Sequence, residues 1–201
     1  MNGKRPVPGL VLASLLLAAL LAGMGYLVIQ QADLSRSNLP ILGEVPDFQF
    51  RDQNDKPFGS QQMLGKVCVV DFIFTRCRGI CPVMANRYTH LYRLFREAPD
   101  LQLISVSVDP EFDSPEVLSQ YAASYGMTDG RWILLHAPLE HVKDLCENGF
   151  MLPAEDLPQG HSGKFALIDR QGRIRGYYDY DSDADQDLLR TQIRALLKAK
   201  E

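Results

Sequence analysis

The chain has 201 residues, of which 46% are hydrophobic and 23% are charged, values typical of a folded globular protein rather than a disordered or fibrous one. The first 30 residues hold two of its 21 basic residues and none of its 25 acidic ones, so the rest carries 19 basic against 25 acidic side chains, a net charge of −6. Because nucleic-acid binding depends on neutralising many phosphates, this balance excludes nucleic acid as the expected partner.

An apolar segment dominates the N-terminus. Residues 10–29 are uncharged and follow Lys4 and Arg5, and about 20 apolar residues are needed to cross a bilayer as a helix. We therefore expect residues 1–30 to be a retained transmembrane helix, with the following domain outside the cytoplasm because basic flanks stay inside. A cleaved signal peptide is the alternative, although its apolar core usually has only about 7–15 residues. Residues 31–46 predict a tether and residues 47–201 the folded domain.

The domain alternates strand and helix patterns. Phe48 and Phe50 alternate with polar residues as in a half-buried strand, and residues 66–75 are nearly all β-branched or aromatic, which predicts a central strand buried on both faces. The expected elements then follow in order: a helix over 82–97, a strand over 101–108, a helix over 114–125, a short strand over 131–135, a short helix over 139–146, a hairpin of strands 164–169 and 173–178, and a last helix over 184–198. This order predicts an α/β domain with a thioredoxin-like fold. On the helix over 82–97, we expect the core to be contacted by Val83, Leu91, Leu94 and Phe95.

Two cysteines carry the most suggestive chemistry. Cys77 and Cys81 lie between a buried strand and the next helix, where open α/β sheets bind ligands. Cys81 falls at the helix N-terminus, where unpaired N–H groups and the helix dipole favour a thiolate. Arg76 and Arg78 act in the same direction. We therefore expect Cys81 to ionise readily and to form a reversible disulfide with Cys77.

The spacing of these cysteines also allows a metal site. Three residues separate Cys77 from Cys81, so both sulfurs can converge on one ion, and two thiolates select copper(I) or zinc, whereas copper(II) requires added imidazole. His161 is the best third ligand, because it lies in a glycine-bounded loop that a thioredoxin-like fold brings against the cysteine helix. The alternative for such a pair is a structural disulfide in an oxidising compartment.

The other cysteines, histidines and one methionine predict structural or surface roles. Cys68 lies inside an apolar strand and is expected to be a buried hydrophobe, and nothing in the spacing requires it to pair with Cys146. Core packing is also expected for Met84. Solvated or surface positions are expected for His90, His136 and His141.

Three separated motifs carry a family resemblance: D-F-I-F-T-R-C-R-G-I-C-P-V-M, S-V-D-P-E-F-D-S-P-E-V-L and H-S-G-K-F-A-L-I-D. Through them, about residues 40–198 resemble the Sco/SenC family of copper chaperones for cytochrome c oxidase assembly. The resemblance implies a thioredoxin-like domain that binds copper through Cys77, Cys81 and His161. It also implies that the protein metallates the binuclear copper site of oxidase subunit two, or reduces the cysteines of that site. Asp109 matches the family's acidic residue beside the copper site, whereas Phe112 departs from the Arg that is common there.

The expected function is therefore that of a membrane-anchored copper chaperone rather than an enzyme. It would reside in the bacterial inner membrane with its domain in the periplasm, and its partners would be oxidase subunit two and a copper donor or thiol reductant. The alternative is a thiol:disulfide oxidoreductase that uses Cys77 and Cys81 as a redox-active pair without metal. Against a thiol peroxidase, the sequence has no peroxide-binding T-x-x-C arrangement before Cys77. For a redox-sensing module, the sequence has no distinguishing feature. Copper binding by the reduced protein separates the first hypothesis from the others.

Overall fold

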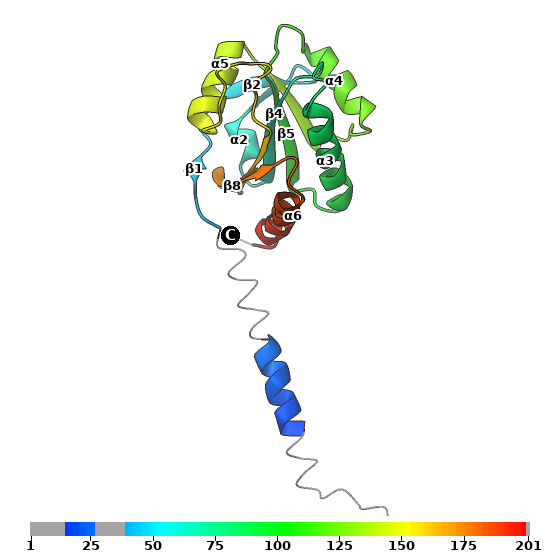
Figure 1. The fold of residues 1–201 in the computed structure, drawn as a ribbon, viewed down its shortest axis with the longest axis vertical. Coiled ribbons are helices and arrows are strands. Elements are labelled where there is room, and N and C mark those ends of the chain that lie inside the picture. Colours follow the sequence, from blue (N-terminus) through cyan, green and yellow to red (C-terminus); the bar gives the residue numbers. More distant parts are fainter. Residues whose placement is uncertain (1–14, 27–38, 200–201) are drawn as a thin grey trace, which may run out of the picture. The chain divides into compact units, whose positions relative to one another are not determined.

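The computed structural model describes residues 15–26 and 39–199, and the chain divides into two units, Met1–Asn38 and Leu39–Glu201 (Figure 1). In the first unit, residues 15–26 form a helix with exposed apolar side chains. Across the two described ranges, no helix combines the length and the apolar character needed to span a membrane. The expected anchor over 1–30 and tether over 31–46 lie partly outside the described residues, so both stay predictions.

The second unit is built on one mixed sheet, in which eight strands of the described chain follow the order β1-β8-β7-β4-β5-β6-β2-β3. Strands β4, β5 and β6 are parallel to one another, and β7 runs antiparallel beside β4. This centre confirms the predicted α/β class. The strands are β1 (Gly43–Glu44), β2 (Gln49–Asp52), β3 (Pro57–Gly59), β4 (Val67–Ile73), β5 (Leu101–Ser107), β6 (Trp132–His136), β7 (Lys164–Ile168) and β8 (Arg173–Asp179).

Helices cover both faces of this sheet, so every residue of β4 and β5 is buried, as their apolar sequences predict. In Figure 1, α3 and α4 lie on one side of the sheet and α5 lies on the other. The helices are α2 (Ser60–Met63), α3 (Cys81–Leu94), α4 (Pro115–Ser124), α5 (Leu139–Asp144), the π-helical turn η1 (Leu145–Gly149) and α6 (Asp183–Lys198).

The buried stripe of α3 differs from the prediction. Val83 and Leu94 are 43% and 41% exposed, so their expected core contacts are wrong, whereas Leu91 and Phe95 are buried as expected. At about 100° per residue, Val83 and Leu94 lie roughly 120° from the middle of the buried face, whereas Leu91 and Phe95 lie on it. The side chains that fill this face are Cys81, Met84, Ala85, Tyr88 and Leu91.

Short strands extend the sheet at both edges. The half-buried strand predicted around Phe50 is β2, which forms a hairpin with β3 and pairs antiparallel with β6. At the other edge, β1 pairs with β8. The carboxyl ends of β4, β5 and β6 thus meet at one edge of the molecule's central sheet, where connecting loops place polar side chains.

Candidate metal centre

The two cysteines follow the central strand β4. The strand ends at Ile73, residues 74–80 form a loop, and α3 starts at Cys81 with Pro82 in its first turn, as predicted. The N–H groups of Val83 and Met84 donate to the carbonyl of Ile80 at 3.0 Å and close this turn. Cys81 is therefore fixed in regular helix and only 1% exposed, whereas Cys77 is half-buried on the loop.

His161 approaches the cysteines from the loop that precedes β7. Its side chain is 6% exposed, and its Nε2 lies 3.3 Å from the sulfur of Cys81. Its Nδ1 lies 3.3 Å from the carbonyl oxygen of Ser162, and the ring of Phe74 packs against it edge-on at 5.5 Å. Because a carbonyl can only accept, Nδ1 carries the proton and Nε2 presents its lone pair to the sulfur. Burial lowers the pKa of His161, which favours this neutral form.

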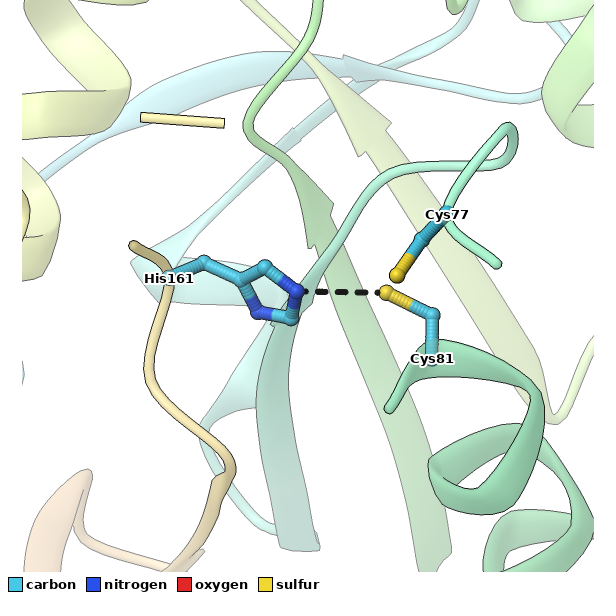
Figure 2. Close-up of side chains that lie close together, drawn as sticks. All are labelled: Cys77, Cys81 and His161. Carbon is cyan, nitrogen blue, oxygen red and sulfur yellow. Dashed lines mark hydrogen bonds between the residues drawn. The ribbon is translucent and has the colours of Figure 1, made fainter. Parts of the chain in front are cut away.

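Cys77, Cys81 and His161 thus converge as predicted. Their two sulfurs and a ring nitrogen all lie within 4.8 Å of one another. Figure 2 shows the sulfur atoms side by side, with the imidazole of His161 pointing at Cys81. Zinc bonds to sulfur and nitrogen are about 2.3 and 2.0 Å long, so two ligands of one such ion lie at most about 4.6 Å apart. Three donor atoms this close together can bind a single ion once their side chains adjust around it.

The expected lowered pKa of Cys81 is wrong. Burial is the main cause that raises the pKa of Cys81 above its ordinary value, and it outweighs a helix dipole whose effect is typically below about 1 kcal/mol. The guanidinium of Arg76, which we expected to stabilise the thiolate of Cys81, instead donates two hydrogen bonds to the buried carboxylate of Asp109. The two nitrogen–oxygen distances are 2.5 and 3.2 Å. The guanidinium also lies 5.0 Å from the ring of Phe112, the residue that departs from the family pattern.

The remaining cysteines, histidines and Met84 largely occupy the positions that the sequence predicts. Cys68 and Cys146 are separate, fully buried thiols, and burial raises the pKa of each to about 12. Met84 is fully buried in the core. His90 and His141 are exposed, whereas His136 is half-buried, with its Nδ1 2.9 Å from the carbonyl oxygen of Asp113.

Sequence reasoning missed the groups that support the cysteine loop. The carboxylate of Asp113 is fully buried and binds the loop and the end of β5, and the ring of Phe74 orients His161. The partners of Asp113 are Thr75 and Ser107. The signal that could have revealed Asp113 is the second aspartate of D-P-E-F-D, directly before the Ser114 that caps α4.

Comparison with known proteins identifies the family. The family model described as SCO1/SenC matches residues 42–198, which is most of the chain. The chain belongs to the SCO1/SenC family. All three converging side chains and both loops around them fall inside the matched region.

Individual relatives agree with this membership. The SCO1 protein homolog of Bacillus subtilis is 28% identical over 183 residues, covering 88% of this chain and 94% of that protein. A protein of Stutzerimonas stutzeri that is named for copper binding is 30% identical over 187 residues, covering 86% and 89% of the two chains. A solved SCO1/SenC family lipoprotein of Bacillus anthracis has a TM-score of 0.71 at 31% identity, over 77% of this chain and 95% of that one.

Proposed function

We propose that this SCO1/SenC protein is a membrane-anchored copper chaperone that holds its cargo through Cys77, Cys81 and His161 and helps to metallate the binuclear copper site of cytochrome c oxidase subunit two. The observation that carries the proposal is the convergence of two sulfurs and one ring nitrogen within 4.8 Å. Two thiolates with one imidazole form a donor set that suits copper, since thiolates favour copper(I) and the added imidazole also suits copper(II). The name of the Stutzerimonas stutzeri relative agrees with copper as the cargo.

The unequal burial of the ligands suits delivery rather than storage. Cys81 and His161 lie inside the protein, whereas Cys77 is half-buried on its loop. A thiolate of the receiving protein can therefore replace the sulfur of Cys77 first, which leaves the ion bound by both proteins before it is passed on. Binding consumes no electrons, but it requires both thiols to lose their protons. Because the pKa of Cys81 is raised, its thiol keeps the proton until the metal displaces it.

The second candidate function is thiol:disulfide exchange at the same cysteines. A disulfide switch is described for BsSco, a member of the Sco family of cytochrome c oxidase assembly proteins that is 28% identical to this chain, with a TM-score of 0.71. In this reaction Cys77 and Cys81 would lose two protons and two electrons to form one S–S bond, and a disulfide of the partner would become two thiols. Copper capture and this oxidation compete for the same two sulfurs.

The proposed location is a bacterial inner membrane, with residues 1–30 as a single-span anchor, residues 31–46 as a tether and residues 47–201 in the periplasm. The uncharged stretch over 10–29 after Lys4 and Arg5 supports this arrangement. A thiol reductant or a copper donor would act on the same domain before delivery, because only reduced cysteines bind copper.

Copper(I) competition against a chromophoric chelator tests the proposal. The reduced full-length protein is expected to bind one copper per chain, and Cys77→Ser, Cys81→Ser or His161→Ala should each remove most of the affinity, because water is a harder ligand and cannot replace the missing donor. Cys68→Ser and Cys146→Ser are the matched controls and should bind normally. Wild-type affinity in Cys77→Ser and Cys81→Ser would refute the proposed site.

A further inference from the structure

The loop that carries Cys77 begins where β4 loses its strand partner. The last main-chain hydrogen bond between β4 and the end of β5 runs from the N–H of Val108 to the carbonyl of Ile73, at 2.8 Å. Beyond it, the N–H of Thr75 donates to the carboxylate of Asp113 at 3.1 Å, and the hydroxyl of Thr75 donates to the same carboxylate at 2.5 Å. A side chain thus takes the place of the missing strand for the residue two positions before Cys77.

Asp113 is itself held firmly by neighbouring strands. Its side chain is fully buried, and its Oδ2 accepts a hydrogen bond of 2.6 Å from the hydroxyl of Ser107 at the end of β5. Its carbonyl oxygen lies 2.9 Å from Nδ1 of His136 at the end of β6, and its N–H donates to the carbonyl of Asp109 at 2.9 Å. A group with this many partners cannot shift without breaking several hydrogen bonds at once.

The three converging side chains differ in how they are held. Cys81 is part of the first turn of α3, and His161 is buried against the ring of Phe74. Cys77 sits on the loop, and its N–H donates to the carbonyl of Phe74, at 3.2 Å on the same loop, which does not fix the loop to the rest of the domain. Besides its packing against the core, the position of Cys77 therefore depends on the contacts made by Thr75 and Arg76 just before it.

Two such ties come from the segment that links β5 to α4. Asp109 binds Arg76, but the side chain of Arg76 is 56% exposed, and contact with water weakens an ion pair. Asp113 binds Thr75 through a fully buried carboxyl group, where water does not compete for the hydrogen bond. The buried tie is the stronger of the two.

We propose that Asp113 is a positioning residue for the proposed copper site, which holds Cys77 at the distance that allows it to share an ion with Cys81 and His161. The carboxylate acts through Thr75 and touches no ligand atom of the cluster. The effect of Asp113 on copper affinity rests on the proposed function, because copper is the proposed cargo. The restraint that Asp113 places on the loop does not, because it is present in the copper-free protein.

Two variants of the full-length chain test this role. Thr75→Val keeps the shape and the N–H bond but removes the hydroxyl donor, and Asp113→Asn leaves an amide facing hydroxyl and N–H donors. Hydrogen exchange of the reduced, copper-free protein should become faster over residues 74–79 in both variants, and in Thr75→Val it should stay unchanged elsewhere. Copper(I) affinity should fall about tenfold or more, the usual effect of losing a group that orients a metal ligand.

Two control variants separate positioning from general destabilisation. Thr75→Ser retains the hydroxyl and should restore both readouts, whereas Leu196→Ala destabilises α6 by removing a buried side chain and should change neither exchange over residues 74–79 nor copper affinity. Wild-type exchange and affinity in Thr75→Val, or an equal loss of affinity in Leu196→Ala, would overturn the inference. If the wild type bound no copper, the proposed function would fail, and the exchange measurement would still decide whether Asp113 restrains the loop.

Discussion

Burial sets the order in which the cysteine thiols can react. Cys68, Cys81 and Cys146 are each at most 1% exposed, and burial raises the pKa of all three, whereas Cys77 is half-buried on its loop. A reagent needs both access and a thiolate, so the three buried thiols lack both requirements. Cys77 is the one thiol of the four that meets a partner without prior opening of the domain.

Alkylation of the reduced protein should therefore label Cys77 first. We expect one maleimide to add rapidly per chain, about tenfold or more faster than the second, because only Cys77 is accessible in the folded state. Intact-mass spectrometry against time, with peptide mapping, measures the order. Cys77→Ser should abolish the fast phase and Cys146→Ser should leave it unchanged, whereas a first label on Cys81 would contradict the assignment.

Asp71 should lower the free energy of unfolding as the pH rises from 4 to 7, because its pKa is raised in the folded protein. This carboxyl is 1% exposed in the middle of β4, and burial raises its pKa from 3.8 to about 7 despite the 2.5 Å hydrogen bond that it accepts from Ser105. Below about pH 4 both the folded and the unfolded chain hold the proton. Between pH 4 and 7 the unfolded chain releases it first, so this group lowers the free energy of unfolding by up to roughly 4 kcal/mol.

Asp71→Asn isolates that contribution, because the amide is neutral and its oxygen can still accept from Ser105. Urea unfolding at several pH values should show the variant gaining stability relative to the wild type as the pH rises from 4 to 7. A constant difference across that range would mean that Asp71 is ionised in the folded state.

The loop before β7 is positioned by a close contact between Gly163 and the ring of Tyr180. A Cβ atom built on Gly163 would lie 2.6 and 2.8 Å from ring carbons of Tyr180 and 3.4 Å from the side chain of Ile80. The N–H of Tyr180 donates to the carbonyl of Gly163 at 3.0 Å, so the two segments approach each other closely here. His161 is two residues away, which makes the absence of a side chain at Gly163 a condition for its position.

Gly163→Ala should therefore weaken copper(I) binding about tenfold by displacing His161. The double variant Gly163→Ala, Tyr180→Ala removes the obstructing ring and should recover most of the affinity, and Tyr180→Ala alone serves as its control. Chelator competition measures all three proteins. Equal copper(I) affinity in Gly163→Ala and the wild type would show that the loop accommodates the methyl group without moving His161.

The predicted features depend on residues near one another in the sequence, whereas the missed features depend on contacts between distant segments. The order from β4 to α6 follows from local hydrophobic patterns and capping residues such as Ser114, which is why the sequence predicts it. The buried face of α3 is only partly predicted, because residue type alone does not reveal that Tyr88 is buried while Val83 and Leu94 are exposed. The pairing of β2 with β6 and the role of Asp113 depend on contacts between distant segments, which local patterns do not encode.

The same distinction explains the candidate site. Cys77, Cys81 and His161 were identified from residue type, spacing and family resemblance, and their convergence follows from the fold. The pKa of Cys81 was predicted in the wrong direction, because the position of a thiol at a helix N-terminus can be seen in a sequence and its burial cannot. Desolvation, the larger effect here, is a property of the assembled domain.

The N-terminal unit differs from the folded domain because its helix exposes large apolar side chains. Leu15, Leu16 and Leu17 are 63%, 64% and 60% exposed on the helix over residues 15–26. Successive helical residues point about 100° apart, so these three leucines present apolar surface in three directions. A helix that is apolar all round is typical of a protein interior or of a membrane span.

Membrane retention should therefore depend on this segment. We expect the full-length protein in the membrane fraction with residues 1–30 still attached, and a reporter fused after Glu201 should be active only outside the cytoplasm. Leu16→Arg with Leu20→Arg should release the protein or block its export, because each arginine within the bilayer costs about 2.5–3.5 kcal/mol. Leu188→Arg, at a 47% exposed position of α6, is the matched control and should change neither result. A soluble product that starts near Gly25 would instead identify a cleaved signal peptide, and the folded domain from Leu39 onward would still carry the complete cluster.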